Sequence, residues 1–235
     1  MRVDVVIPAL NEEAALPLVL GDIPRDLVRR VVVADNGSTD RTAEVARAHD
    51  AEVVHQPERG YGAACLAALE HLRADPPDVV VFLDGDHADD ATQLGLLLAP
   101  LLRGEADLVL GSRVAGATHG ALTPQQRVGN RVACVALRTL YGARYTDLGP
   151  FRAIRWDALA QLNMVDRNYG WTVEMQIKAA QRGPAASEVP VRYRPRVGTS
   201  KVSGTVRGTL GASYKILLLL GRYALPGAAR GHAPP

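Results

Sequence analysis

Cysteine is scarce in this chain. The 235 residues contain only Cys65 and Cys134, which are far apart in the sequence and both lie in segments with a helical pattern. A disulfide-stabilised domain or a cysteine-rich zinc site would need several cysteines at short spacings. We therefore expect neither, and we expect a reducing compartment.

Long hydrophobic runs are also missing. No stretch of about 18 uninterrupted apolar residues occurs, so the sequence predicts no transmembrane helix. The short apolar run at the start contains Asp4 and is followed by Asn11 and two glutamates, which does not fit a signal peptide. With 47% hydrophobic and 22% charged residues, the composition is that of a soluble α/β domain. We expect a cytoplasmic protein.

Acidic residues are absent after Glu188. Residues 189–235 contain no aspartate or glutamate, whereas acids outnumber bases in the preceding part of the chain. The basic residues in this last segment are Arg192, Arg194, Arg196, Lys201, Arg207, Lys215, Arg222 and Arg230. Such an asymmetry indicates that this end of the chain meets something anionic, such as phosphates, lipid headgroups or nucleic acid.

Two common phosphate-binding motifs are absent as well. A dinucleotide-binding fold would show G-x-G-x-x-G after its first strand, and a P-loop NTPase would show G-x-x-x-x-G-K-S/T. Neither pattern occurs. Both of these classes of nucleotide-binding protein are therefore excluded.

The sequence does contain a regular alternation of strand and helix patterns. The expected strands cover residues 3–7, 28–34, 52–55, 79–83, 107–110 and 187–194, with one more short strand ending near residue 154. The expected helices cover residues 40–49, 63–72, 92–102, 123–141 and 171–182. A further helix is expected to begin at Asn11, with Glu12 and Glu13 in its first turn. This alternation predicts an α/β fold with a mostly parallel, doubly wound sheet.

Three of the expected strands end in polar loops, at residues 8–12, 35–40 and 84–86. In a parallel sheet these loops share the edge where ligands bind. The central strand ends in Asp84-Gly85-Asp86, two carboxylates with no cation in their own loop. A bare pair of this kind is more often a solvated loop, but three converging loops favour a site. Hard oxygen ligands suit Mg2+ or Mn2+, which keep open positions for substrate phosphates.

Six short motifs occur in a specific order: Val-Ile-Pro-Ala-Leu-Asn-Glu-Glu, Ala-Asp-Asn-Gly-Ser-Thr-Asp, Gly-Tyr-Gly-Ala-Ala, Leu-Asp-Gly-Asp, Gly-Ser-Arg and Arg-Val-Gly-Thr-Ser-Lys. Over residues 2–205 this set resembles the family 2 inverting glycosyltransferases, and within them the dolichyl or polyprenyl-phosphate sugar transferases. The resemblance implies a GT-A type nucleotide-sugar-binding domain over residues 1–205, followed by a basic, apolar tail over residues 206–235. It also implies transfer of a hexose from a UDP-glucose or GDP-mannose type donor to a polyprenyl phosphate with inversion, and no nucleic-acid partner.

The resemblance assigns roles to individual residues. Donor-binding residues would be Pro8, Asn11, Glu12, Asp35, Asp84, Gly85, Arg113 and Ser200, with Asp84 and Asp86 as the metal ligands. Catalytic residues would be Asp86, Arg196, Lys201 and Asp147, and acceptor-binding residues Arg127 and Arg131. The chemistry agrees, because a metal together with arginine and lysine donors stabilises the charge that develops on a departing nucleoside diphosphate.

One departure from the family pattern concerns the metal site. Relatives often continue the acid pair as Asp-x-Asp-x-Gln, but Ala88 stands where the glutamine would be. This leaves His87, Asp89 or Asp90 as replacements. For His87, an ordinary loop position is the competing interpretation.

A second departure concerns the catalytic base. Many relatives carry Glu-Asp-x-Asp before a helix that ends in glycine, but here Glu174 takes the last place and Thr172 that of the catalytic aspartate. A sugar hydroxyl needs a base near its reacting oxygen, whereas a phosphate monoester is already ionised at pH 7. The departure therefore favours a phosphate acceptor. Asp147 is left as a base, as an orienting residue or as a cap of the turn at residues 148–150.

Several alternatives stay open. The same donor chemistry could act on a soluble or glycan hydroxyl, and a sugar-phosphate nucleotidyltransferase or a nucleotide-sugar sensor would share the sheet architecture. The apolar run at residues 216–220 lies between Lys215 and Arg222, so it either rests on an anionic membrane surface or packs on the domain as a last helix. A lipid-phosphate acceptor favours the first interpretation, and with it a peripheral position at the cytoplasmic face of the membrane.

Overall fold

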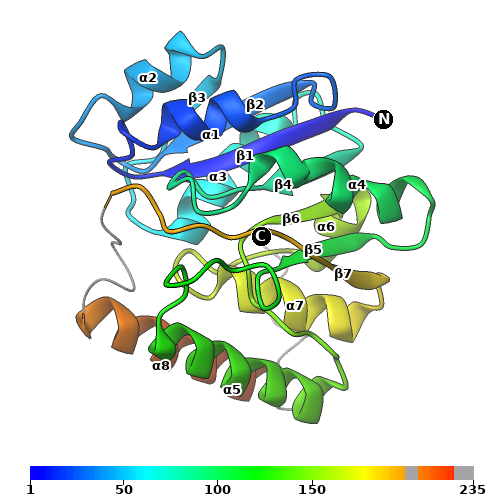
Figure 1. Cartoon of the computed structure of the whole chain (residues 1–235). Helices are drawn as coiled ribbons and strands as arrows, with labels where there is room; N and C mark the ends of the chain where they lie inside the picture. The colour runs from blue at the N-terminus through cyan, green and yellow to red at the C-terminus, as the bar shows by residue number, and fades with distance from the viewer. Residues whose placement is uncertain (199–205, 225–235) are drawn as a thin grey trace.

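A seven-stranded sheet forms the centre of the computed structural model, which describes residues 1–198 and 206–224 and, in the last helix, the side chains from Tyr214 onward. The strands are β1 (Val3–Ala9), β2 (Arg30–Asp35), β3 (Glu52–His55), β4 (Val79–Phe82), β5 (Leu108–Ser112), β6 (Arg152–Arg155) and β7 (Ala186–Pro190). Their order in the sheet is β3-β2-β1-β4-β6-β5-β7 (Figure 1). Only β6 among them runs antiparallel to its neighbours, β4 and β5. The prediction of a mostly parallel α/β sheet is confirmed.

Helices cover both faces of the sheet. They are α1 (Leu16–Asp22), α2 (Thr42–Ala48), α3 (Tyr61–Leu72), the 3-10 helix η1 (Ala91–Gln93), α4 (Leu94–Leu102), α5 (Pro124–Tyr141), α6 (Trp156–Leu162), α7 (Trp171–Arg182) and α8 (Val206–Ala224). Side chains of a strand point alternately to its two faces. Accordingly, Val5 packs with Leu16 of α1 and Leu97 of α4, whereas Val6 packs with Cys65 of α3 and Trp171 of α7.

A third layer lies beyond α7. Here α5 and α8 run side by side, farthest from the sheet (Figure 1). Leu137 of α5, Ile177 of α7 and both Leu219 and Leu220 of α8 form a small apolar cluster between the three helices. The last helix is therefore packed on the domain through one side.

The loop after β1 departs from the sequence prediction. The helix expected at Asn11 begins instead at Leu16, so that prediction is wrong. Asn11 adopts a left-handed backbone with φ of 52°. Its side-chain oxygen accepts a hydrogen bond from the Thr39 amide at 2.8 Å, and its own amide donates to the Ser38 hydroxyl at 2.9 Å. Asn11 thus joins the loops after β1 and β2 instead of capping a helix.

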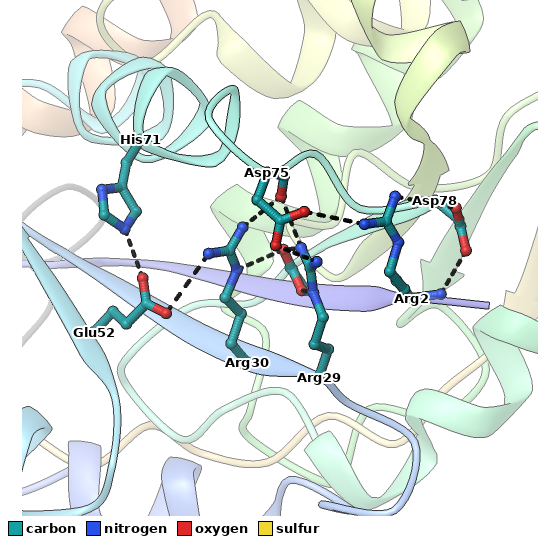
Figure 2. Close-up of polar contacts among 8 residues, drawn as sticks. Arg2, Arg29, Arg30, Glu52, His71, Asp75 and Asp78 are labelled. Atoms are coloured by element: carbon teal, nitrogen blue, oxygen red, sulfur yellow. Dashed lines mark hydrogen bonds and ion pairs between the residues drawn. The ribbon is translucent and has the colours of Figure 1, made fainter.

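A network of charged residues lies at the amino-terminal end of the strands β1 and β2 (Figure 2). Fully buried Asp4 accepts hydrogen bonds from Arg29 at 2.6 Å and from Arg30 at 2.9 Å. Arg29 also pairs with Asp75 at 2.7 Å, and Arg2 pairs with the same aspartate at 3.0 Å. A buried carboxylate needs such partners to remain ionised. Asp4 is therefore part of the structural framework, remote from the strand ends that carry the ligand-binding loops.

Candidate active site

The carboxyl ends of β1, β2 and β4 surround a cavity of about 320 Å³. Its lining includes Pro8, Glu12, Asn36, Arg59, Gly60, Tyr61, Asp84, Gly85, Asp86, Asn168, Tyr169 and Arg196. Six of these residues were expected from the sequence. Five of them lie at or just after the ends of the parallel strands β1 and β4, which end at the same side of the sheet, and Arg196 follows β7.

Asp84 and Asp86 lie at the floor of this first cavity in different environments. Burial and the charge of Asp86 raise the pKa of Asp84 to about 7. The carboxylate of Asp84 accepts a hydrogen bond from the Tyr61 hydroxyl at 2.9 Å. Asp86 instead pairs with Arg196 at 2.9 Å and accepts from the Ala88 amide at 3.0 Å. The two carboxylates therefore repel each other, and a divalent cation bound by both would relieve this repulsion.

A third acidic side chain, Asp89, is also buried. Neither of its side-chain oxygens has a hydrogen-bond partner within the described part of the chain. Burial and the charge of Asp84 raise its pKa well above the ordinary value. Across residues 1–198 and 206–224, no group of three or more His, Cys, Asp or Glu side chains is arranged to hold a metal alone. Two hard carboxylates beside a phosphate-sized cavity nevertheless fit Mg2+ or Mn2+, because these ions share their ligands with substrate phosphates.

The other two candidate replacements for the missing glutamine are engaged elsewhere. The ring nitrogen Nε2 of His87 lies 3.0 Å from Asp22 of α1. Asp90 accepts from the Thr92 amide at the start of η1 and pairs with Arg192 at 2.8 Å. These contacts favour the interpretation of His87 as a loop residue.

Two residues predicted to contact the donor, Asp35 and Asn11, are absent from the cavity lining. Asp35 is buried, accepts from the Ser38 amide at 3.0 Å and lies 3.3 Å from His55. Asn11 links the same loop to β1, as described above. Ser200 and Lys201, which were predicted to close over the phosphates, lie outside the described residues.

A second cavity, of about 360 Å³, opens between α5 and the end of β5. Its lining includes Arg113, Leu122, Arg127, Asn130, Arg131, Cys134, Val135, Arg138, Tyr145, Thr146 and Asp147. Both arginines predicted to bind the acceptor are therefore here. Within the part of the chain that the structure describes, Arg127, Arg131 and Arg138 form no ion pair with a carboxylate. The cavity thus presents three unneutralised cations.

Arg113 and Asp147 form a fixed pair at the inner end of this second cavity. The Asp147 carboxylate, 1% exposed, accepts from the Arg113 amide and from its guanidinium at 2.8 and 2.7 Å. The Leu148 amide donates to it as well, at 2.8 Å. Arg113 also stacks on Tyr193, 5.0 Å from the ring centre. Of the roles left open for Asp147, this geometry favours that of orienting Arg113.

Glu174 lines neither cavity. Its fully buried carboxylate accepts from the amides of Val165 and Asp166 and from the Tyr223 hydroxyl, and pairs with Lys178 at 2.7 Å. Every oxygen of Glu174 is thus used to hold the loop before α7. It has the surroundings of a structural residue.

Comparison with known proteins identifies the family. Residues 4–161 match the model of glycosyl transferase family 2. The chain belongs to glycosyltransferase family 2. A glycosyltransferase of Mycobacterium tuberculosis with no assigned activity is 44% identical over 211 residues, which cover 88% of this chain and 93% of that protein.

Two relatives are named for polyprenyl phosphates. The dolichyl-phosphate hexose transferase of Haloferax volcanii is 38% identical over 202 residues, covering 84% of this chain and 85% of that protein. The undecaprenyl-phosphate mannosyltransferase of Micrococcus luteus is 33% identical over 222 residues, covering 88% and 90%.

A similar solved structure contains a small phosphorylated acid. The glucosyl-3-phosphoglycerate synthase of Mycobacterium tuberculosis, in complex with Mn2+, UDP-glucose and phosphoglyceric acid, superposes with a TM-score of 0.78 at 26% identity. The match covers 95% of this chain and 79% of that one. The GT-A fold is thereby confirmed for this family 2 glycosyltransferase.

Several cavity residues of this glycosyltransferase escaped the sequence prediction. Asn36 accepts from the Gly60 amide at 2.8 Å and donates to the backbone of Gln56 and Glu58. Tyr61 belongs to the Gly-Tyr-Gly motif, which carries the family resemblance without assigning the tyrosine a role. Asn168 and Tyr169 come from a loop that no motif marks. Their side chains reach the cavity only through contacts between distant segments.

No helix within the described residues is both long and apolar enough to cross a membrane.

Proposed function

We propose that this glycosyltransferase transfers a hexose from a nucleotide sugar of the UDP-glucose or GDP-mannose type to a polyprenyl phosphate, with inversion at the sugar carbon. The observation that carries the proposal is the second cavity, in which Arg127, Arg131 and Arg138 have no carboxylate partner within the described residues. An unneutralised cluster of arginines suits an anionic acceptor, because guanidinium groups bind phosphate oxygens through two hydrogen bonds at once.

The donor would lie in the first cavity. Of the residues that line it, Pro8, Glu12 and Arg59 would contact the nucleotide, and Asp84, Asp86 and Arg196 would lie near the diphosphate. A Mg2+ or Mn2+ held by Asp84 and Asp86 would supply positive charge to the diphosphate as it departs. Arg196, which pairs with Asp86 in this structure, is placed to donate to the same phosphate oxygens.

The acceptor would attack from the second cavity. A phosphate monoester is ionised at neutral pH, so its oxygen needs no base to remove a proton. This matches the surroundings of Asp147, whose carboxylate is occupied by Arg113 and Leu148. Arg113 lines this cavity, and its guanidinium stacks on Tyr193. A direct displacement between the two sites inverts the sugar.

A lipid acceptor requires contact with a bilayer, and two helices suit that purpose. α5 exposes Val128, Val132 and Val135 beside its arginines, and α8 exposes Tyr214, Leu217 and Leu218. Neither helix contains an acidic residue. Apolar side chains among cations are typical of helices that lie in the headgroup region of anionic membranes. We infer a peripheral position at the cytoplasmic face of the membrane.

The second candidate is a soluble, phosphorylated acceptor that reacts through a hydroxyl. The similar solved structure holds phosphoglyceric acid, and the arginines of the second cavity would also bind a small acid of that kind. A hydroxyl acceptor would then need a base, for which Asp147 is the candidate within that cavity.

One acceptor screen separates the two candidates. The protein would be incubated with Mn2+ and radiolabelled UDP-glucose or GDP-mannose, together with either a polyprenyl phosphate in detergent or phosphoglyceric acid. We expect label to enter the organic phase only with the lipid phosphate. Labelled product with phosphoglyceric acid alone would refute the lipid assignment, and no product with either acceptor would refute both.

A further inference from the structure

Tyr61 makes a contact to which neither the family motifs nor the proposed chemistry assigns a role. It is the first residue of α3, it lines the first cavity, and its hydroxyl donates to one carboxylate oxygen of Asp84 at 2.9 Å. Within the described residues this is the only hydrogen bond to the Asp84 side chain. The buried carboxylate thus depends on one neutral donor from a distant helix.

The two glycines beside Tyr61 fix its position. The Ala63 amide donates to the Arg167 carbonyl at 2.8 Å, so this turn is tied to the loop before α7. A Cβ atom at Gly62 would lie 1.9 Å from the Asp166 carbonyl oxygen, and one at Gly60 would lie 2.1 Å from the Arg167 carbonyl oxygen. Neither position can accept a side chain without moving backbone. The close approach therefore places the Tyr61 ring against the floor of the cavity.

The two carboxylates of the site consequently have partners of different kinds. Asp86 pairs with the charged Arg196, whereas Asp84 receives a hydrogen bond from an uncharged phenol. A cationic side chain beside Asp84 would compete with a metal ion for the negative charge of the Asp84 carboxylate. A hydroxyl fixes the orientation of one oxygen and leaves the negative charge available to a cation at the other oxygen.

We propose that Tyr61 is a positioning residue for the metal ligand Asp84: its hydroxyl holds the carboxylate in the orientation in which it binds Mg2+ or Mn2+. This inference rests on the proposed metal site. Hydrogen-bonding partners of metal ligands typically contribute 10- to 100-fold in metal affinity. Tyr61→Phe removes only the hydroxyl and keeps the ring that fills the space.

The test measures Mn2+ binding directly, without turnover. Mn2+ would be titrated into the wild-type protein, Tyr61→Phe and Tyr141→Phe in the presence of UDP, and free Mn2+ would be followed by electron paramagnetic resonance. Tyr141 is the matched control, because its hydroxyl also donates a hydrogen bond, to the Leu220 carbonyl at 2.6 Å, but it lines neither cavity. We expect the dissociation constant to rise about tenfold in Tyr61→Phe and to stay unchanged in Tyr141→Phe.

A double-mutant cycle shows whether Tyr61 acts through Asp84. In an Asp84→Asn background, Tyr61→Phe should produce no further loss of Mn2+ affinity. If Tyr61→Phe lowered the Mn2+ affinity equally in the wild-type and Asp84→Asn backgrounds, the positioning role would be overturned. Wild-type Mn2+ affinity in Tyr61→Phe would overturn it as well. A wild-type protein that binds no Mn2+ even with UDP would refute the metal proposal itself, which is a separate outcome.

Discussion

The ammonium group of Lys215 on α8 lies 2.9 Å from a carboxylate oxygen of Asp166, in the loop before α7. Asp166 is buried and also accepts from the amides of Asn168 and Gly170. A Cβ atom at Gly170 would lie 2.2 Å from a methyl group of Leu219, so α8 rests directly on this loop. Because Asn168 lines the first cavity, the last helix is connected to that cavity through a few contacts.

The first prediction follows from this contact. Lys215→Met should raise the Michaelis constant for the donor several-fold and leave the turnover number nearly unchanged, because the loop that carries Asn168 loses one of its restraints. The loss of donor-binding free energy should be about 1 kcal/mol, since Lys215 is one-third exposed and solvent partly screens its ion pair with Asp166. Arg222→Met is the control, on the same helix. Steady-state kinetics with varied donor measure both constants, and an unchanged donor constant would restrict the pair to a role in stability.

The sequence predicted the site well where local pattern is sufficient. Buried parallel strands have continuous apolar runs, so the ends of β1, β2 and β4 were recognisable, and the polar loops that follow them necessarily share one edge. The strand pattern predicted the loops that carry Pro8, Glu12, Asp84 and Asp86, and the family resemblance supplied the roles of these four residues. Each of them lies in the first cavity.

Contacts between distant segments could not be predicted in the same way. Asparagine is a residue type favoured at helix N-caps, but the Asn11 side chain binds the Thr39 amide, 28 residues away. Glu174 occupies a family motif position, yet the loop before α7 and Tyr223 of α8 surround it. Tyr61 meets Asp84 only because α3 packs against the loop before α7. Local propensity contains no information about such partners.

The second prediction concerns Asp86. Asp86→Ala should abolish turnover while leaving the fold intact, because a loop carboxylate contributes little to the core. A ligand at about 100 times its dissociation constant adds about 2.7 kcal/mol of stability. The thermal shift with UDP- or GDP-sugars should therefore appear in the wild-type protein with Mn2+, disappear with EDTA, and be absent in Asp86→Ala. Near-normal turnover of this variant would contradict the metal assignment.

The third prediction tests the acceptor cavity. Arg131→Gln should raise the Michaelis constant for the acceptor roughly tenfold or more, since a hydrogen bond to a charged group contributes about 1.5–3 kcal/mol. The donor constant should stay the same, because Arg131 lines only the second cavity. Arg47→Gln, on exposed α2, is the matched control. If Arg131→Gln altered the Michaelis constant for the donor instead, the assignment of the second cavity to the acceptor would be wrong.

The fourth prediction concerns stability at low pH. Burial would raise the pKa of Asp22, but hydrogen bonds from Arg194 and His87 outweigh burial and hold the pKa below the ordinary value of 3.8. A carboxylate with a lowered pKa stabilises the fold above its unfolded value, and this stabilisation is lost as the pH falls through the folded value. Urea unfolding between about pH 5 and pH 3 should therefore show a steeper loss of stability in the wild-type protein than in Asp22→Asn. Asp26→Asn, at an exposed position, should match the wild-type slope; equal slopes in all three proteins would refute the role of Asp22.

The last prediction addresses the membrane. Val132 is 52% exposed on α5, in the layer that α5 and α8 form farthest from the sheet (Figure 1). A glutamate there would place a charge of the wrong sign against anionic lipid and would remove apolar surface. Val132→Glu should therefore reduce flotation with liposomes that contain anionic lipid, and it should raise the Michaelis constant for a long-chain polyprenyl phosphate more than for a short, water-soluble analogue.

Leu102→Glu is the matched control for this experiment. Leu102 is 64% exposed at the end of α4, which packs on the sheet and not on the α5 and α8 layer. The same charge added there should leave flotation unchanged. Binding of the wild-type protein should weaken at high salt, because cations near an anionic surface contribute about 1 kcal/mol each and salt screens that attraction. A wild-type protein that stays in the soluble fraction at low salt, with Val132→Glu indistinguishable from it, would contradict membrane binding and favour the soluble acceptor.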